Sequence, residues 1–273
     1  MVISAPRDKP VVLWCHPRSV SSAFERAFME RKDFKCLHEP YGEPFHYNLC
    51  ERISQRYTDE EIKRDHADKM DITYAQVTNQ LLTPQTDGKR VFSKDMAQYI
   101  VKGDEVIVTL DNLQKMHHVF LIRSPKLACP SYYRCCVGDA ATETNFSHYD
   151  PEEAGYRELR TLFDYIRENK VNGNTSLVMI DADTLTANPE ATLKYVCEKV
   201  GLEWDPGMLS WEKGKVEEFS KWPGFHRDAE NSTGFKATTG NHKNDADLPD
   251  IVHQTIEENL PVYEYLKSFA FKA

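Results

Sequence analysis

Residues 11–28 read VVLWCHPRSVSSAFERAF. Five apolar residues of strand length are followed by a short polar turn and then by apolar residues at helical spacing. The turn carries three hydroxyls, those of Ser19, Ser21 and Ser22, and the guanidinium of Arg18. A strand that runs through a tight turn into a helix forms an anion site, because the first backbone N–H groups of the helix have no intrahelical partner. The stretch therefore predicts a phosphate or sulfate site, the alternative being that the serines merely cap the helix.

Strand-like and helix-like segments alternate along the rest of the chain, with no internal repeat and no linker between them. The strand candidates are short and rich in Val, Ile, Leu or Phe, as buried parallel strands are: 11–15, 34–37, 91–92 with its neighbours, 119–122 and 177–180. Helical spacing occurs at 22–31, 59–82, 106–116, 131–137, 151–169, 189–200 and 249–268. We expect Asp150 and Asn188 to cap the helices that follow them, and Gly201 to end the helix before it. This order predicts one α/β domain over residues 1–273, with a mainly parallel sheet covered by helices on both faces.

Composition and charge exclude several classes of protein. The 273 residues contain 34 Lys and Arg against 43 Asp and Glu, a net charge of -9, and nucleic-acid binding needs the opposite surplus. No apolar run reaches the roughly 18 residues of a membrane-spanning helix. Residues 1–10 lack an apolar stretch of signal-peptide length, and the seven cysteines form no Cys-x-x-Cys pair. These features predict a cytoplasmic protein with reduced thiols and without nucleic-acid or membrane partners; the oligomeric state is unknown from the sequence.

The loop after the first strand lacks the glycines and the Lys-Ser/Thr pair of an ATP-type phosphate loop. As Pro17-Arg18-Ser19-Val20-Ser21-Ser22, it resembles the 5′-phosphosulfate loop of the PAPS-dependent sulfotransferases (PAPS is 3′-phosphoadenylyl sulfate). The resemblance implies a three-layer α/β/α P-loop-type fold. It also implies that a phosphosulfate loop at 16–23 holds the 5′ end of PAPS through Arg18, Ser19, Val20, Ser21 and Ser22.

A second motif, RSPKLACPSYYR at residues 123–134, follows a later strand. It resembles the 3′-phosphate segment of the same family, with Arg123 at the strand end and Ser131 eight residues on. Ser131 lies about two helical turns further along, so both side chains can reach one phosphate. The resemblance implies that Arg123 and Ser131 bind the 3′-phosphate. We expect Pro130 to kink the helix just before Ser131.

The family closes a loop over the nucleotide near its C-terminus. In this chain the corresponding region is a C-terminal loop and helix at 222–270, which includes WPGFHR at 222–227 and NSTGF at 231–235. The resemblance implies cofactor contacts by Arg227, Ser232, Thr233 and Gly234. The family's common Arg-Lys-Gly motif, followed by Gly-x-Trp, is not present here.

The catalytic residues depart from the common pattern. Cytosolic small-molecule sulfotransferases carry Lys-x-His after the third strand, with His as the base, whereas residues 92–96 read FSKDM. Lys94 matches, its simpler alternative being an ion pair with Asp95, and no His follows. Other branches use a Glu after the second strand, so we expect Glu39 to be the general base, with His38 and Asp95 as alternatives. A carboxylate can act so once burial or a neighbouring charge raises its pKa.

The resemblance implies transfer of a sulfuryl group from PAPS to a hydroxyl or amine of a small-molecule acceptor, with PAP as product. No metal is expected, because Pro40 and Pro44 forbid the helix of an H-E-x-x-H zinc site. Three alternatives stay open: a non-catalytic nucleotide-binding protein of the same fold, a P-loop phosphotransferase with Asp181 as metal carboxylate, and cyclisation or elimination after sulfation. Aromatic-rich stretches at 41–57, 146–149 and 211–225 could wall the acceptor pocket.

Overall fold

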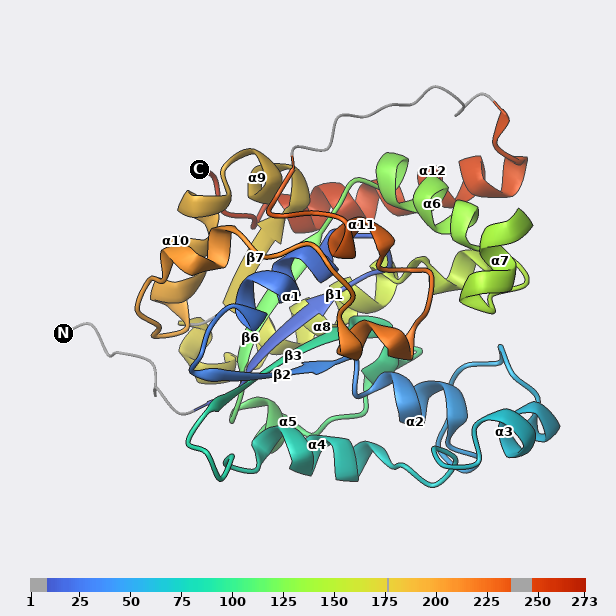
Figure 1. Cartoon of the computed structure of the whole chain (residues 1–273), viewed down its shortest axis with the longest axis horizontal. Helices are drawn as coiled ribbons and strands as arrows, with labels where there is room; N and C mark the ends of the chain where they lie inside the picture. The colour runs from blue at the N-terminus through green and yellow to red at the C-terminus, as the bar shows by residue number, and fades with distance from the viewer. Residues whose placement is uncertain (1–8, 176, 237–246) are drawn as a thin grey trace.

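A sheet of five parallel strands occupies the centre of the molecule (Figure 1). The computed structural model describes residues 9–175, 177–236 and 247–273. The strands are β1 (Val11–Cys15), β2 (Phe34–His38), β3 (Arg90–Met96), β6 (His117–Ile122) and β7 (Leu177–Asp181). Their spatial order is β2-β3-β1-β6-β7. All five predicted strands are present, and the predicted α/β class with a parallel central sheet is confirmed.

The register places β1 at the centre of the sheet. Val11 lies beside Phe92 of β3 on one side and His117 of β6 on the other. Because parallel strands all end at the same edge, the loops that follow β1, β3 and β6 emerge together. The two phosphate motifs predicted from the sequence follow β1 and β6, which are neighbours, and so the fold brings them to one place.

Successive side chains of β1 enter two different cores, one on each face of the sheet. Val12 and Trp14 pack into a large cluster with residues of helices α4, α6, α8 and α12. Val11 and Leu13 pack on the opposite face, with residues of α1 and α10. Strand residues alternate between faces with a period of two, and because both faces are covered the strand is apolar throughout. This gives the three-layer arrangement seen in Figure 1.

The helices are α1 (Ser21–Met29), α2 (Gly42–Tyr47), α3 (Asp59–Asp65), α4 (Tyr74–Leu82), α5 (Leu110–Leu113), α6 (Pro125–Cys135), α7 (Gly138–Thr144), α8 (Tyr156–Glu168), α9 (Ala182–Ala187), α10 (Pro189–Lys199), α11 (Arg227–Glu230) and α12 (Asp250–Lys267). Short 3₁₀ turns are η1 (Ala97–Ile100), η2 (Pro151–Ala154), η3 (Val171–Asn174), η4 (Pro206–Leu209) and η5 (Glu217–Lys221). Strands β4 (Val101–Lys102) and β5 (Glu105–Val106) form a small antiparallel pair. Among the described helices none has the length and apolar character needed to cross a bilayer.

Three helix predictions were wrong in extent, each for a local reason. The segment 59–82 contains two helices, because Thr58 and Thr73 each begin one with a capping box. The segment 106–116 keeps only the short α5, since its first residue belongs to the β4–β5 pair. The helix expected from residue 131 begins six residues earlier, with Pro125 in its first turn, and runs through Pro130.

The capping predictions are confirmed in two of three cases. The Asp150 side chain accepts from the Glu152 N–H at 3.0 Å, and Gly201 follows α10 with a left-handed φ of 68°. Asn188 makes no side-chain cap bond. Gly155, with φ 73°, divides the predicted helix 151–169 into η2 and α8. A side chain there would meet Gln98 Oε1 at 2.6 Å, so the close approach requires glycine.

Candidate active site

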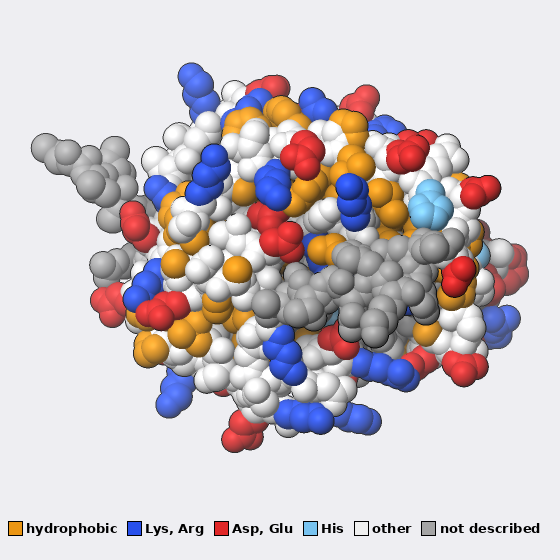
Figure 2. All heavy atoms as spheres, turned by 90° about the horizontal axis from the view of Figure 1, so that it is seen from above, with side chains coloured by type: hydrophobic (Ala, Val, Ile, Leu, Met, Phe, Trp, Pro, Cys, Tyr) orange, Lys and Arg blue, Asp and Glu red, His pale blue; other side chains and the backbone are white. Residues whose placement is uncertain are grey.

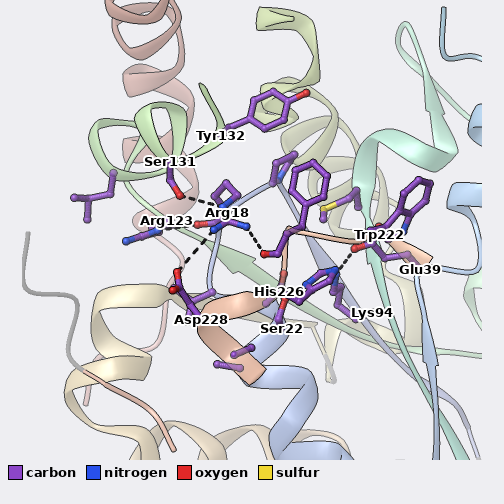
Figure 3. A pocket seen from close by; sticks show the side chains of 18 of the residues that line it. Arg18, Ser22, Glu39, Lys94, Arg123, Ser131, Tyr132, Trp222, His226 and Asp228 are labelled. Carbon is purple, nitrogen blue, oxygen red and sulfur yellow. Dashed lines mark hydrogen bonds and ion pairs between the residues drawn. The ribbon is translucent and has the colours of Figure 1, made fainter. Parts of the chain in front are cut away.

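A cavity of about 460 Å³ lies at the carboxyl edge of the sheet. Its lining includes residues from both phosphate motifs, from the ends of β2 and β3, and from the C-terminal segment (Figure 3). Figure 2 shows acidic and basic side chains interspersed on the face of the molecule seen from above, and no block of Lys and Arg gathers there outside the residues drawn in grey. The cavity therefore presents a local cluster of donors within a surface of mixed charge.

The loop between β1 and α1 adopts an unusual backbone. Arg18 and Val20 have φ values of 62° and 71°, in the left-handed region that a β-branched residue such as Val rarely occupies. Such turns direct consecutive N–H groups toward one point and form an anion-binding concavity. The helix begins after Val20, which makes no side-chain cap bond. The interpretation of the serines as simple caps was therefore wrong.

The second motif lies directly against this loop. The Arg123 Nη1 donates to the Arg18 carbonyl at 2.9 Å, and the Arg18 Nε donates to Ser131 Oγ at 3.0 Å. Figure 3 shows the two guanidinium groups and this hydroxyl together. Burial and the nearby charge of Arg18 lower the pKa of Arg123. Two adjacent cations in a buried place need an anion between them, so the predicted pairing of the two motifs is present in the geometry.

Two donors in this region are left without a partner among the described residues. They are the Arg123 Nε and the Ser19 Oγ, both buried. A buried polar group without a partner costs about 1–3 kcal/mol. A phosphate or sulfonate oxygen supplies the missing acceptor, so these residues fit an anionic nucleotide group.

His16 connects the two motifs and was not found from the sequence. Its Nε2 accepts from the Arg123 N–H at 3.0 Å, and its Nδ1 lies 2.9 Å from the Pro17 carbonyl. Burial lowers the pKa of His16 to about 3, so the ring stays neutral and Nε2 keeps its lone pair. The Tyr156 hydroxyl donates to the Arg123 carbonyl at 2.7 Å on the other side. The Arg123 backbone is therefore fixed from two directions.

A buried ion pair forms the other half of the cavity. Lys94 Nζ bonds Glu39 Oε1, and the Tyr99 hydroxyl donates to Glu39 Oε2 at 2.8 Å. Burial disfavours both charges, but each charge stabilises the other. Lys94 consequently lowers the pKa of Glu39 below its usual value, and Glu39 raises the pKa of Lys94. Glu39 and Lys94 both line the cavity, and the alternative pairing of Lys94 with Asp95 was wrong.

Asp95 and His38, the alternative bases, are not among the residues that line the cavity. Asp95 accepts from the Tyr41 N–H at 2.9 Å and from Ser93 Oγ at 2.6 Å, and burial raises its pKa to about 8. His38 lies one layer deeper, beside Glu39. Neither is placed to contact an acceptor, so the geometry disfavours both alternatives.

The C-terminal residues divide into two groups. Ser232 and Gly234 line the cavity, whereas Thr233 and Arg227 do not. Arg227 instead pairs with Glu143 at the surface. Residues 237–246 of the predicted C-terminal loop lie outside the described residues. Asp181, the carboxylate of the phosphotransferase alternative, does not line the cavity and accepts from the Tyr263 hydroxyl at 2.7 Å.

Several lining residues were not assigned from the sequence. His226 lies 2.8 Å from Ser22 Oγ through its Nδ1. An aromatic wall is made by His46, Tyr99, Phe146, Trp222 and Phe225. Donor atoms of His38, Glu39 and His226 lie within 4.8 Å of one another, a spacing that could hold a metal ion. The expectation that no metal binds therefore stays a prediction.

A parallel sheet whose neighbouring strands deliver two arginines and several hydroxyls to one cavity defines an α/β protein that binds a nucleotide-type anion. The family model described as "Sulfotransferase domain" matches residues 9–270, and the chain belongs to this family. It is also similar to the sulfotransferase domain of the olefin synthase of Synechococcus PCC 7002, with a TM-score of 0.52 and 14% identity over 92% of this chain and 94% of that one. That likeness confirms the fold.

Two kinds of curated relative were found. The branched-chain-amino-acid aminotransferase-like protein 2 of Arabidopsis thaliana is 25% identical over 255 residues, which are 93% of this chain and 40% of that protein. The chain thus spans about two fifths of the length of this relative. The sulfotransferase ppzF of Metarhizium majus (strain ARSEF 297) is 31% identical over 113 residues, 37% of this chain and 32% of that protein.

Proposed function

We propose that this sulfotransferase-family chain transfers a sulfuryl group from PAPS to a hydroxyl or amine of a small molecule. The observation that carries the proposal is the convergence of Arg18, Arg123 and Ser131 on one cavity. Buried donors without partners lie in the same place. Two cations and a hydroxyl suit a nucleotide with a second phosphate, since Arg binds phosphate in a planar fork and each such bond is strong.

The loop at 16–23 would hold the 5′-phosphosulfate on its backbone N–H groups and on Ser21 and Ser22. Arg123 and Ser131 would hold the 3′-phosphate. These roles come from the positions of the residues at the carboxyl edge of β1 and β6. The Arg18 side chain reaches Ser131, so it would lie between the two phosphate positions.

Transfer breaks the bond between sulfur and the phosphate oxygen and forms a bond from sulfur to the acceptor atom. The acceptor loses one proton, which we assign to the carboxylate of Glu39. Lys94 keeps Glu39 ionised, as a base must be, and Glu39 lies at the cavity wall. The remaining contribution is positioning and electrostatic stabilisation, as in phosphoryl transfer.

The acceptor would occupy the aromatic end of the cavity. Trp222 Nε1 is buried without a partner among the described residues, as is Gln98 Oε1, and both residues line the cavity. One supplies a donor and the other an acceptor. An acceptor with an apolar body and two polar positions fits such a site.

Binding of PAP against ADP tests the proposal. PAP carries the 3′-phosphate and ADP does not, so the protein should bind PAP at least about 10-fold more tightly, as expected for charge-assisted bonds of 1.5–3 kcal/mol. Arg123→Ala should remove this preference, whereas Arg157→Ala, at an exposed pair with Asp104, should keep it. Equal affinity for PAP and ADP in the unaltered protein would refute the proposal. PAP binding without transfer to a broad panel of acceptors would instead support the non-catalytic alternative.

A further inference from the structure

A chain of four polar side chains runs inward from the phosphate loop. Ser22 Oγ lies 2.8 Å from His226 Nδ1, His226 Nε2 lies 3.2 Å from His38 Nε2, and His38 Nδ1 lies 2.8 Å from Glu25 Oε2. Ser22 and His226 line the cavity, and Figure 3 shows them side by side. His38 and Glu25 are buried behind them. The residues come from α1, from β2 and from the turn before α11, so the folded chain assembles this series.

The protonation of the chain follows from its surroundings. Burial lowers the pKa of His38 and of His226, so each ring is neutral and carries one N–H. Burial also raises the pKa of Glu25 well above its usual value, an effect that Lys94 opposes. Glu25 Oε1 has no partner among the described residues, which fits a neutral carboxyl group better than a carboxylate.

These states give every hydrogen bond in the chain one direction. The Glu25 carboxyl donates to His38 Nδ1, and His38 Nε2 donates to His226 Nε2. His226 Nδ1 then donates to Ser22 Oγ. The Ser22 hydroxyl is left to donate into the cavity, where the loop faces its ligand.

We propose that Glu25, His38, His226 and Ser22 form a proton relay that delivers one proton to the oxygen bound at Ser22. This inference rests on the proposed function, in which that oxygen is the phosphate oxygen released when the sulfur–oxygen bond breaks. Ser22 gives its proton to the phosphate and takes one from His226, which takes one from His38, which takes one from Glu25. One proton leaves the chain, Glu25 becomes a carboxylate, and water in the emptied cavity returns the proton by the same route.

The local charges explain why such a relay is useful. Negative charge develops on the departing oxygen, and stabilising it lowers the barrier. The nearest cations already have partners: Arg18 bonds Ser131 and the Phe225 carbonyl, and Lys94 bonds Glu39. Proton donation through Ser22 neutralises this charge without moving either cation.

Histidine tautomers distinguish the relay from two other arrangements of the same atoms. The relay requires the proton on Nε2 of His38 and on Nδ1 of His226. An ionised Glu25 would reverse both, with Nδ1–H on His38 and Nε2–H on His226. A metal ion bound to both Nε2 atoms and to Glu39 would place both protons on Nδ1.

The first experiment is ¹⁵N NMR of the full chain with labelled histidine at neutral pH, assigned through His38→Gln and His226→Gln. The relay tautomers are expected; either of the other patterns overturns the proposal. This measurement needs no substrate, so it gives an answer even if PAP fails to bind and the proposed function falls.

The second experiment uses Glu25→Gln. The amide still donates to His38 Nδ1 but has no proton to transfer, so PAP affinity should stay within about twofold while kcat falls about 100-fold. The solvent deuterium isotope effect on kcat should also be lost. Glu217→Gln, an exposed carboxylate of η5, is the control and should change neither. A folded Glu25→Gln protein with unaltered kcat overturns the relay; if the variant does not fold, the tautomer measurement decides.

Discussion

The Lys94–Glu39 pair allows a prediction whose size follows from burial. The exposed fraction of the Lys94 side chain is 0% and that of Glu39 is 3%. Lys94→Met keeps the length of the side chain and removes its charge, which leaves the Glu39 carboxylate buried with the Tyr99 hydroxyl as its remaining partner. Breaking a buried pair from one side costs about 3–5 kcal/mol. We expect the free energy of unfolding to fall by that amount.

Urea denaturation measures this change, and two further variants make it specific. Lys89→Met removes a surface lysine whose pair with Asp87 is exposed, and should cost at most about 1 kcal/mol. Combining Lys94→Met with Glu39→Gln removes both charges and should recover at least about 2 kcal/mol of the loss. If Lys94→Met costs no more than Lys89→Met, or if the double variant recovers nothing, the buried pair is not what the geometry indicates.

The same pair fixes the sign of a pH effect. The pKa of Glu39 in the folded protein lies below its ordinary value of 4.5, because Lys94 stabilises the carboxylate despite burial. The stabilisation is therefore present above that ordinary value and is lost as the pH falls through the lower folded pKa. In the Lys94→Met protein this acid-dependent loss should be absent from urea denaturation curves recorded between neutral and acidic pH.

Two other predictions concern single groups. Burial raises the pKa of Asp95 to about 8 from an ordinary 3.8, so its contribution to stability is greatest below the ordinary value and declines as the pH rises toward 8; Asp95→Asn should reduce that decline in urea denaturation at pH 5 and pH 8, and an unchanged decline would contradict the assignment. Because no metal is expected, dialysis against a chelator should leave PAP affinity and turnover unchanged, and loss of either, restored by Zn²⁺ or another divalent ion, would show that His38, Glu39 and His226 hold a metal.

The sequence was sufficient to predict the sheet, because its strands are buried on both faces and read as continuous apolar runs. Val11–Cys15 was predicted with its observed bounds. The helices were harder, since short capping signals divide long stretches of helical spacing. Thr58 and Thr73 begin separate helices within one such stretch. Those capping boxes were present in the sequence and could have been used.

The site was predictable only where one local motif supplies its own geometry. Arg18, Arg123 and Ser131 belong to two such motifs, and the structure brings them together. His226 was different, because its partners Ser22 and His38 lie 204 and 188 residues away in the sequence. A contact of that separation has no local signal, and a lone histidine in a polar segment reads as a surface residue.

The concentration of buried ionisable groups at one edge of the sheet also has a thermodynamic meaning. Glu25, His38, Glu39 and Lys94 are all buried within hydrogen-bonding or ion-pairing reach of one another. Replacing such groups with well-packed apolar residues is often neutral or stabilising, so stability alone gives no reason to keep them. The apolar cores on both faces of the sheet offset their cost. An arrangement that folding does not require, placed where parallel strands deliver ligands, is best explained by the movement of charge and protons during the reaction.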